Sequence, residues 1–173
     1  MHPMWFGDSY DIVKRFFIEA LTSLGYTVYV DPMLTEKWRS KDDEIKYYQL
    51  LNAKPMDYVD STKMPKALFL DPDTGVKSGH SKHHVAFDVI AKNLDDFDIL
   101  ISFDQSFSRG NDHLEQMQNK LAELKNMGCC GFFYDSHAKF LLASKDAKQL
   151  IKLEKNLINA GLPKRRLIRS SGE

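Results

Sequence analysis

Three apolar segments of this 173-residue chain end in aspartate, and carboxylates at such positions are suited to chemistry. Asp31 follows "YTVYV", Asp71 and Asp73 follow "ALFL" within "FLDPDTG", and Asp104 follows "DILISF". Clustered carboxylates hold divalent cations, act as general bases, or accept hydrogen bonds from an amino group or a ribose. Aspartate is also a common turn and cap residue, and Asp31 and Asp71 each precede a proline, so each position taken alone fits a plain strand exit equally well.

The segments that end in these aspartates alternate with helical segments. Apolar stripes at helical spacing predict helices over residues 9–24, 81–94, 112–127 and 145–160. Apolar runs rich in β-branched and aromatic residues predict strands over 26–31, 67–71, 97–104, 129–136 and 138–144, and a short one at 165–169. This alternation predicts an α/β fold: a three-layer, Rossmann-like sandwich with a mainly parallel sheet and an antiparallel edge strand.

Residues 34–66 are less regular than the rest of the chain. They contain a plausible helix at 41–52 within a polar, proline-punctuated stretch. We interpret 34–66 as an insertion or connection within a single α/β domain that spans residues 1–173.

The aspartates are predicted to meet in space. Parallel strands end on one rim of their sheet, and ligands bind beyond that rim. Gln105 and Arg109 follow the third of the strands, in "FDQSFSRG", and carry groups that contact phosphate or base. The histidines of "GHSKHH" match no closed zinc-site pattern, so we assign no metal ligand.

Charge and composition narrow the range of partners that the protein is expected to bind. The 24 basic and 24 acidic residues cancel, so no global field draws the protein onto nucleic acid or an anionic membrane, and any such binding must be local. No apolar run approaches the ~20 residues of a membrane span, so we expect no membrane partner. Adjacent cysteines, Cys129 and Cys130, rarely bridge each other, which favours a reducing, cytoplasmic location. The oligomeric state stays open.

Three motifs resemble, in order, the layout of a bacterial family that methylates an adenine of large-subunit ribosomal RNA. They are "GDSYDIVKR" (7–15), "YVDP" (29–32) and "LFLDPDTG" (68–75). Gly7, Asp11 and Lys14 match the family's first motif, Asp31 matches a strand end before its cofactor loop, and Asp71 matches its Asp-Pro-Pro-Tyr segment. The resemblance implies that Asp71 receives the adenine amino group, with S-adenosylmethionine nearby. The stretch after Asp31, "PMLTEKW", lacks the family's glycines, so this loop is degenerate.

The chain is also similar, over nearly its whole length, to a set of uncharacterised bacterial and prophage-associated proteins. They share the "GDSYDIVK", "LDPDTG" and "Q-x-x-x-R" features. This similarity implies the same fold and the same site.

Three functions remain open at this point. The first is a methyltransferase-like domain that acts on nucleic acid or nucleotides, with S-adenosylmethionine as its cofactor. The second is a nuclease or phosphodiesterase that holds a divalent cation on the same carboxylates, and the third is a non-catalytic binding domain. The candidate catalytic residues are Asp71, Asp73 and Lys14, and the candidate binding residues are Gly7, Asp8, Asp11, Asp31, Gly75, Asp104, Gln105 and Arg109.

Overall fold

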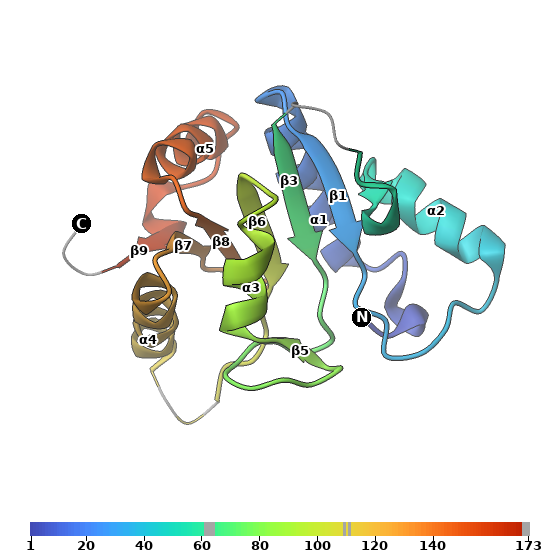
Figure 1. Cartoon of the computed structure of the whole chain (residues 1–173), viewed down its shortest axis with the longest axis horizontal. Coiled ribbons are helices and arrows are strands. Elements are labelled where there is room, and N and C mark those ends of the chain that lie inside the picture. The colour runs from blue at the N-terminus through green and yellow to red at the C-terminus, as the bar shows by residue number, and fades with distance from the viewer. Residues whose placement is uncertain (61–64, 109, 111, 171–173) are drawn as a thin grey trace.

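The computed structural model describes residues 1–60, 65–108, 110 and 112–170, in which seven strands form one sheet between two layers of helices (Figure 1). Across the sheet the order is β2-β1-β3-β6-β8-β7-β9. The strands span Thr27–Asp31 (β1), Lys54–Pro55 (β2), Lys66–Leu70 (β3), Ile99–Phe103 (β6), Cys130–Tyr134 (β7), Phe140–Ser144 (β8) and Leu167–Arg169 (β9). Gly75–Val76 (β4) and His84–Val85 (β5) form a separate parallel pair.

Strand direction confirms the predicted sheet. β2, β1, β3 and β6 are parallel neighbours, and β9 pairs antiparallel with β7 at the edge. A second reversal lies inside the sheet, because β8 is antiparallel to both of its neighbours, β6 and β7. A short turn between β7 and β8 lets the chain fold straight back beside β6.

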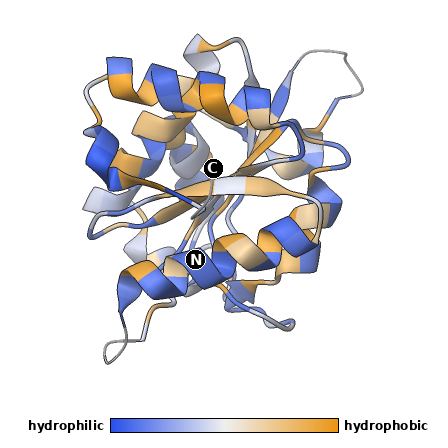
Figure 2. Cartoon of the chain, turned by 90° about the vertical axis from the view of Figure 1, so that its left-hand side faces the viewer, coloured by the Kyte–Doolittle hydropathy of each residue, from blue (hydrophilic) through white to orange (hydrophobic). Residues whose placement is uncertain are grey.

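Helices cover both faces of the sheet. They span Ser9–Ser23 (α1), Lys41–Leu51 (α2), Phe87–Asn93 (α3), His113–Asn126 (α4) and Ala147–Asn159 (α5). α1, α2 and α5 share one hydrophobic cluster with the sheet, and α3 and α4 share another on the opposite face. Figure 2 shows helices on the two sides of the sheet, with hydrophobic and hydrophilic positions alternating along them. None of the described helices has both the length and the apolar character that a membrane crossing requires.

Two predicted helix starts are wrong. α3 begins at Phe87 rather than residue 81, because the backbone of His83 to Val85 bonds to the segment after β3: Thr74 N donates to His83 O at 2.8 Å. α5 is capped by Asp146, whose side chain accepts a hydrogen bond from Lys148 N. Ser144, the residue before the predicted start at 145, is the last residue of β8 and donates its hydroxyl hydrogen to Asp98 O at 2.6 Å.

Residues 34–66 supply two parts of the sandwich. They contain α2, the edge strand β2, and a 3₁₀ turn at Met56–Tyr58. Ser40 caps α2, because its hydroxyl oxygen accepts a hydrogen bond from Asp43 N at 3.0 Å. This region therefore places a helix beside α1, from which Tyr47 reaches Asp71 at the end of β3.

Candidate functional site

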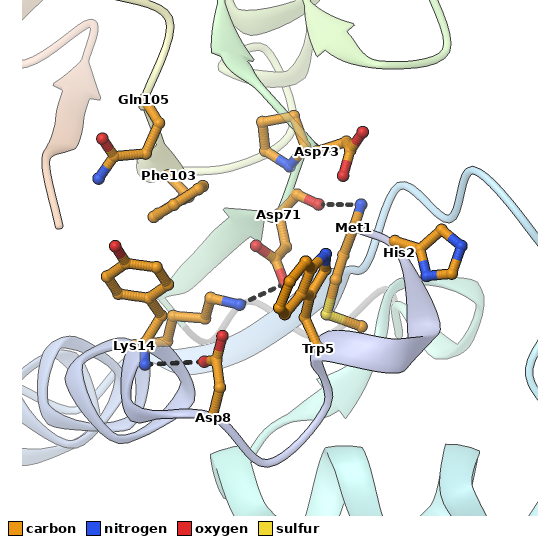
Figure 3. A pocket seen from close by; sticks show the side chains of 11 residues that line it. Met1, His2, Trp5, Asp8, Lys14, Asp71, Asp73, Phe103 and Gln105 are labelled. Atoms are coloured by element: carbon orange, nitrogen blue, oxygen red, sulfur yellow. Dashed lines mark hydrogen bonds and ion pairs between the residues drawn. The ribbon is translucent and has the colours of Figure 1, made fainter.

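A cavity of about 250 Å³ lies at the carboxyl ends of β3 and β6, beside the start of α1 (Figure 3). From β1 the chain crosses to β2 on one side, whereas β3 lies on the other side and leads on to β6. Strand order thus reverses between β1 and β3, which is where open α/β sheets bind ligands. Polar lining comes from Asp8, Lys14, Asp71, Asp73 and Gln105, and the remaining walls come from Met1, His2, Trp5, Tyr10, Pro72 and Phe103.

At the floor of the cavity, one buried ammonium joins two buried carboxylates. Lys14 Nζ lies 2.8 Å from Asp11 Oδ1 and 2.7 Å from Asp71 Oδ2, and the three side chains are at most 5% exposed. Gly7 N donates to the second oxygen of Asp11 at 2.7 Å. Tyr47 Oη donates to Asp71 Oδ2 at 3.0 Å. The spacing of Asp11 and Lys14, one turn apart on α1, brings both to the same face of the helix.

The other oxygen of Asp71 is different. Within the described residues no hydrogen bond reaches Asp71 Oδ1, although the side chain is only 2% exposed. Every fully buried side-chain oxygen of the described residues has a hydrogen-bond partner. Because Asp71 Oδ1 has none, it is not fully buried and is accessible from the cavity that Asp71 lines. In Figure 3 the Lys14 ammonium points to the Asp71 carboxylate, and both side chains line the cavity. A buried carboxylate with one oxygen fixed and one free is a preorganised acceptor for a ligand donor.

Burial and charge shift the protonation equilibria of this cluster. Burial alone would lower the pKa of Lys14, but the charges of Asp71 and Asp11 outweigh it and raise the pKa above its usual value. Burial raises the pKa of Asp11, and the positive charge of Lys14 offsets part of this increase. Burial, together with the charges of Asp71 and Asp11, raises the pKa of Tyr47 well above its usual value. Lys14 is therefore charged and Tyr47 neutral at physiological pH.

The Tyr47 hydroxyl predicts a pH-dependent stability. Replacing Tyr47 with phenylalanine is expected to cost about 1.5–3 kcal/mol near pH 7, the usual contribution of a hydrogen bond to a charged group. Because the folded pKa of Tyr47 is raised, its contribution is present below the unfolded pKa of about 10 and is lost as the pH rises above it. Urea unfolding at pH 7 and pH 11 is thus expected to show a smaller effect of Tyr47→Phe at pH 11. Tyr58→Phe, at a 72% exposed position, is the control and should change neither value.

Aromatic rings form the cavity walls. The Tyr10 ring lies 5.5 Å from that of Phe103 and stacks on His137 at 6.0 Å. Gln105 is held beside them because its amide nitrogen donates to His137 O. Trp5 lines the cavity while remaining 56% exposed. Flat apolar surfaces of this kind bind planar rings.

The strand-end aspartates share a rim but lie in different surroundings. Side chains alternate along a strand, and Asp71 follows Phe69 onto the face of α1 and α2. Asp31 is in register with Leu70 and opens into a separate cavity with Trp38 and Tyr48. Asp104 is one residue beyond Phe103 and meets α4 on the opposite face.

Asp104 is the centre of a second buried cluster. Its Oδ2 lies 2.5 Å from Lys120 Nζ, and its Oδ1 accepts hydrogen bonds from Val76 N at 3.1 Å and from Ser106 N at 3.0 Å. Burial lowers the pKa of Lys120 despite this partner. Gly75 packs directly against Asp104, so both predicted binding residues lie in this cluster and outside the cavity lining.

The remaining candidates are placed as follows. Asp8 and Asp73 line the cavity at its mouth. Gly7 donates its backbone N–H to Asp11 and does not line the cavity. Arg109 lies outside the described residues. Tyr47 was not among the candidates. The sequence carried a signal for it, because Tyr47 and Leu51 are one turn apart in the predicted helix at 41–52. Both are buried in the structure, and a buried tyrosine hydroxyl requires a hydrogen-bond partner.

The segment after β1 does not fit the S-adenosylmethionine loop that the resemblance implies. Asp31 Oδ1 accepts a hydrogen bond from Met33 N at 2.8 Å, and Met33 has a positive φ of 44°. The amino group of Met1 donates to Pro32 O, Met33 O and Asp71 O at 2.7–2.9 Å. With side chains at each position and these backbone groups already bonded, the loop offers no close backbone approach to the cofactor.

Comparison with known proteins leaves this site to be interpreted from its own geometry. No protein-family model, curated protein or solved structure matches the chain. Among the described residues, no three His, Cys, Asp or Glu side chains gather closely enough to hold a metal ion.

Proposed function

We propose that the protein is a methyltransferase-like α/β domain whose strand-end cavity binds a nucleobase that carries an amino group. One observation carries the proposal: Asp71 Oδ1 is a free acceptor on a side chain that is otherwise buried and fixed. An exocyclic amino group is the donor that this acceptor suits. The base belongs to a nucleoside, a nucleotide or a nucleic acid.

Lys14 supports the same ligand. Within the described residues, two of its three ammonium hydrogens bond to Asp11 and Asp71, which leaves the third for a ligand in the cavity that Lys14 lines. An acceptor and a donor side by side complement the amino group and adjacent ring nitrogen of adenine or cytosine. The aromatic walls supply the stacking surfaces that flat bases require.

The position of Lys14 argues against the phosphodiesterase alternative. This alternative holds a divalent cation on Asp71 and Asp73, but the Lys14 ammonium already lies 2.7 Å from Asp71 Oδ2, and 2.8 Å from Asp11 Oδ1. Its single positive charge offsets one of the two carboxylate charges, so the pair already holds a fixed cation of the protein itself.

Asp71→Asn tests the proposal through ligand preference. The amide oxygen of the variant must face the donors Lys14 and Tyr47, so its NH₂ group turns into the cavity and replaces an acceptor with a donor. We expect adenosine or cytidine to bind the wild type and to bind Asp71→Asn roughly 10- to 100-fold more weakly. The preference for adenosine over inosine, or for cytidine over uridine, should fall in parallel. Titration calorimetry measures both quantities.

Asp31→Asn is the matched control, because it makes the same change at a neighbouring strand end outside the cavity. An asparagine oxygen there can still accept from Met33 N, so binding should be unchanged. Thermal unfolding of both variants checks that they are folded. The proposal fails if no amino-bearing base or nucleoside binds at millimolar concentration, or if Asp71→Asn keeps the wild-type preference.

A further inference from the structure

The mouth of the cavity is acidic. Asp8 and Asp73 lie on opposite sides of Asp71 in Figure 3, and all three carboxylates line the cavity. Asp73 is 28% exposed and lies 3.2 Å from the ring of His83, beyond the cavity lining. A ligand that enters the cavity therefore passes between carboxylates.

The cations of the described cavity lining are already engaged by the protein. Lys14 is held by Asp11 and Asp71, and the Met1 amino group directs its three hydrogens to backbone carbonyls. His2 Nε2 lies 3.3 Å from a carboxylate oxygen of Glu36. A phosphate on the ligand would lie at the mouth of the cavity. Among the described lining residues, no ammonium hydrogen points there, and the one hydrogen of Lys14 without a protein partner lies at the floor.

The start of α1 is likewise closed to phosphate. A helix amino terminus attracts anions through its free backbone N–H groups. Here Asp8 Oδ1 accepts hydrogen bonds from Tyr10 N at 2.8 Å and from Asp11 N at 3.3 Å. Asp11 Oδ2 accepts a further hydrogen bond from Gly7 N. Carboxylates of the chain thus occupy the position that a phosphate would take.

We infer that the cavity binds its ligand as a free base or nucleoside and discriminates against nucleotides and nucleic-acid strands. The inference rests on the proposed function and narrows its ligand class. It identifies Asp73 as a specificity-determining residue, because its carboxylate lies at the mouth without touching the floor network. A phosphate on the ribose would bring like charges together at the mouth, and we expect this repulsion to weaken binding roughly tenfold, which is about 1.4 kcal/mol.

Calorimetric titration of the full chain with adenosine, cytidine and their 5′-monophosphates tests the inference. We expect the nucleoside to bind roughly tenfold or more tightly than its monophosphate at low salt. The ratio should shrink at 0.3 M salt, where screening is strong. Asp73→Asn should also reduce the ratio several-fold, mainly by improving binding of the monophosphate. Glu115→Gln, the same charge change at an exposed position of α4 on the far face, should leave the ratio unchanged.

Two outcomes would overturn the inference and are distinguishable from each other. If a monophosphate or a short single-stranded oligonucleotide binds as tightly as the nucleoside, the discrimination against phosphate is wrong and the proposed function stands. If neither nucleosides nor bases bind, the proposed function fails and the inference fails with it.

Discussion

Replacing Lys14 with methionine is expected to destabilise the protein by about 3–5 kcal/mol, because it leaves two buried carboxylates without their shared cation. Asp11 and Asp71 both bond to the Lys14 ammonium, and neither is more than 2% exposed. Without that charge, one carboxyl group is expected to take up a proton and its pKa to rise further. Urea unfolding of the wild type and Lys14→Met at pH 7 measures the difference.

The pH dependence of Lys14→Met has a defined sign. A carboxyl group whose folded pKa is raised binds its proton more tightly in the folded state, so stability is regained as the pH falls toward the unfolded pKa of about 4. The difference from the wild type should therefore be smaller at pH 5 than at pH 7. A constant difference across this range would contradict a charge-based explanation.

Lys41→Met is the matched control. Lys41 also pairs with a carboxylate three residues away on a helix, Glu44, at 2.7 Å, but its side chain is 76% exposed. Exposed pairs are screened by water and contribute little. If Lys14→Met costs no more than Lys41→Met, the buried cluster is not what stabilises the start of α1 against β3.

Replacing Gly75 with alanine is expected to cost about 3–5 kcal/mol, through backbone strain and a steric clash together. Gly75 has a φ of 123°, a conformation that residues with side chains rarely adopt. An added Cβ would also lie 2.1 Å from Asp104 Oδ1 and 2.8 Å from Asp104 Cα. The backbone atom cannot move aside like a flexible side chain, and the carboxylate is fixed by Lys120, Val76 and Ser106.

Gly79→Ala separates the two terms. Gly79 has a φ of 81°, but an added Cβ would meet nothing within 4 Å. This variant should therefore show only the cost of the backbone conformation, about 1–2 kcal/mol. Chemical unfolding of both variants gives the steric term as the difference. Equal losses would show that the Asp104 cluster gives way without cost.

The helices and strands were largely predictable from local sequence, and the exceptions have long-range causes. α1 begins at Ser9, where the sequence predicts its start, and the strands lie within a few residues of their predicted bounds. The helix predicted from residue 81 starts late because His84 and Val85 pair with β4, the short strand that follows β3. A helical periodicity in the sequence does not reveal that these residues pair with a strand nine positions earlier in the chain.

The amino-acid sequence by itself determined which residue types stand at the strand ends and that Asp11 and Lys14 share one face of α1. Only the tertiary structure decided which aspartate meets them. Both faces of this sheet are covered by helices, so the strands are apolar at nearly every position and their pattern does not reveal which side chains face α1. The pairing of Asp71 with Lys14 and Tyr47, 57 and 24 residues away, follows from strand register and helix packing. Those same contacts leave one oxygen of Asp71 free in the cavity.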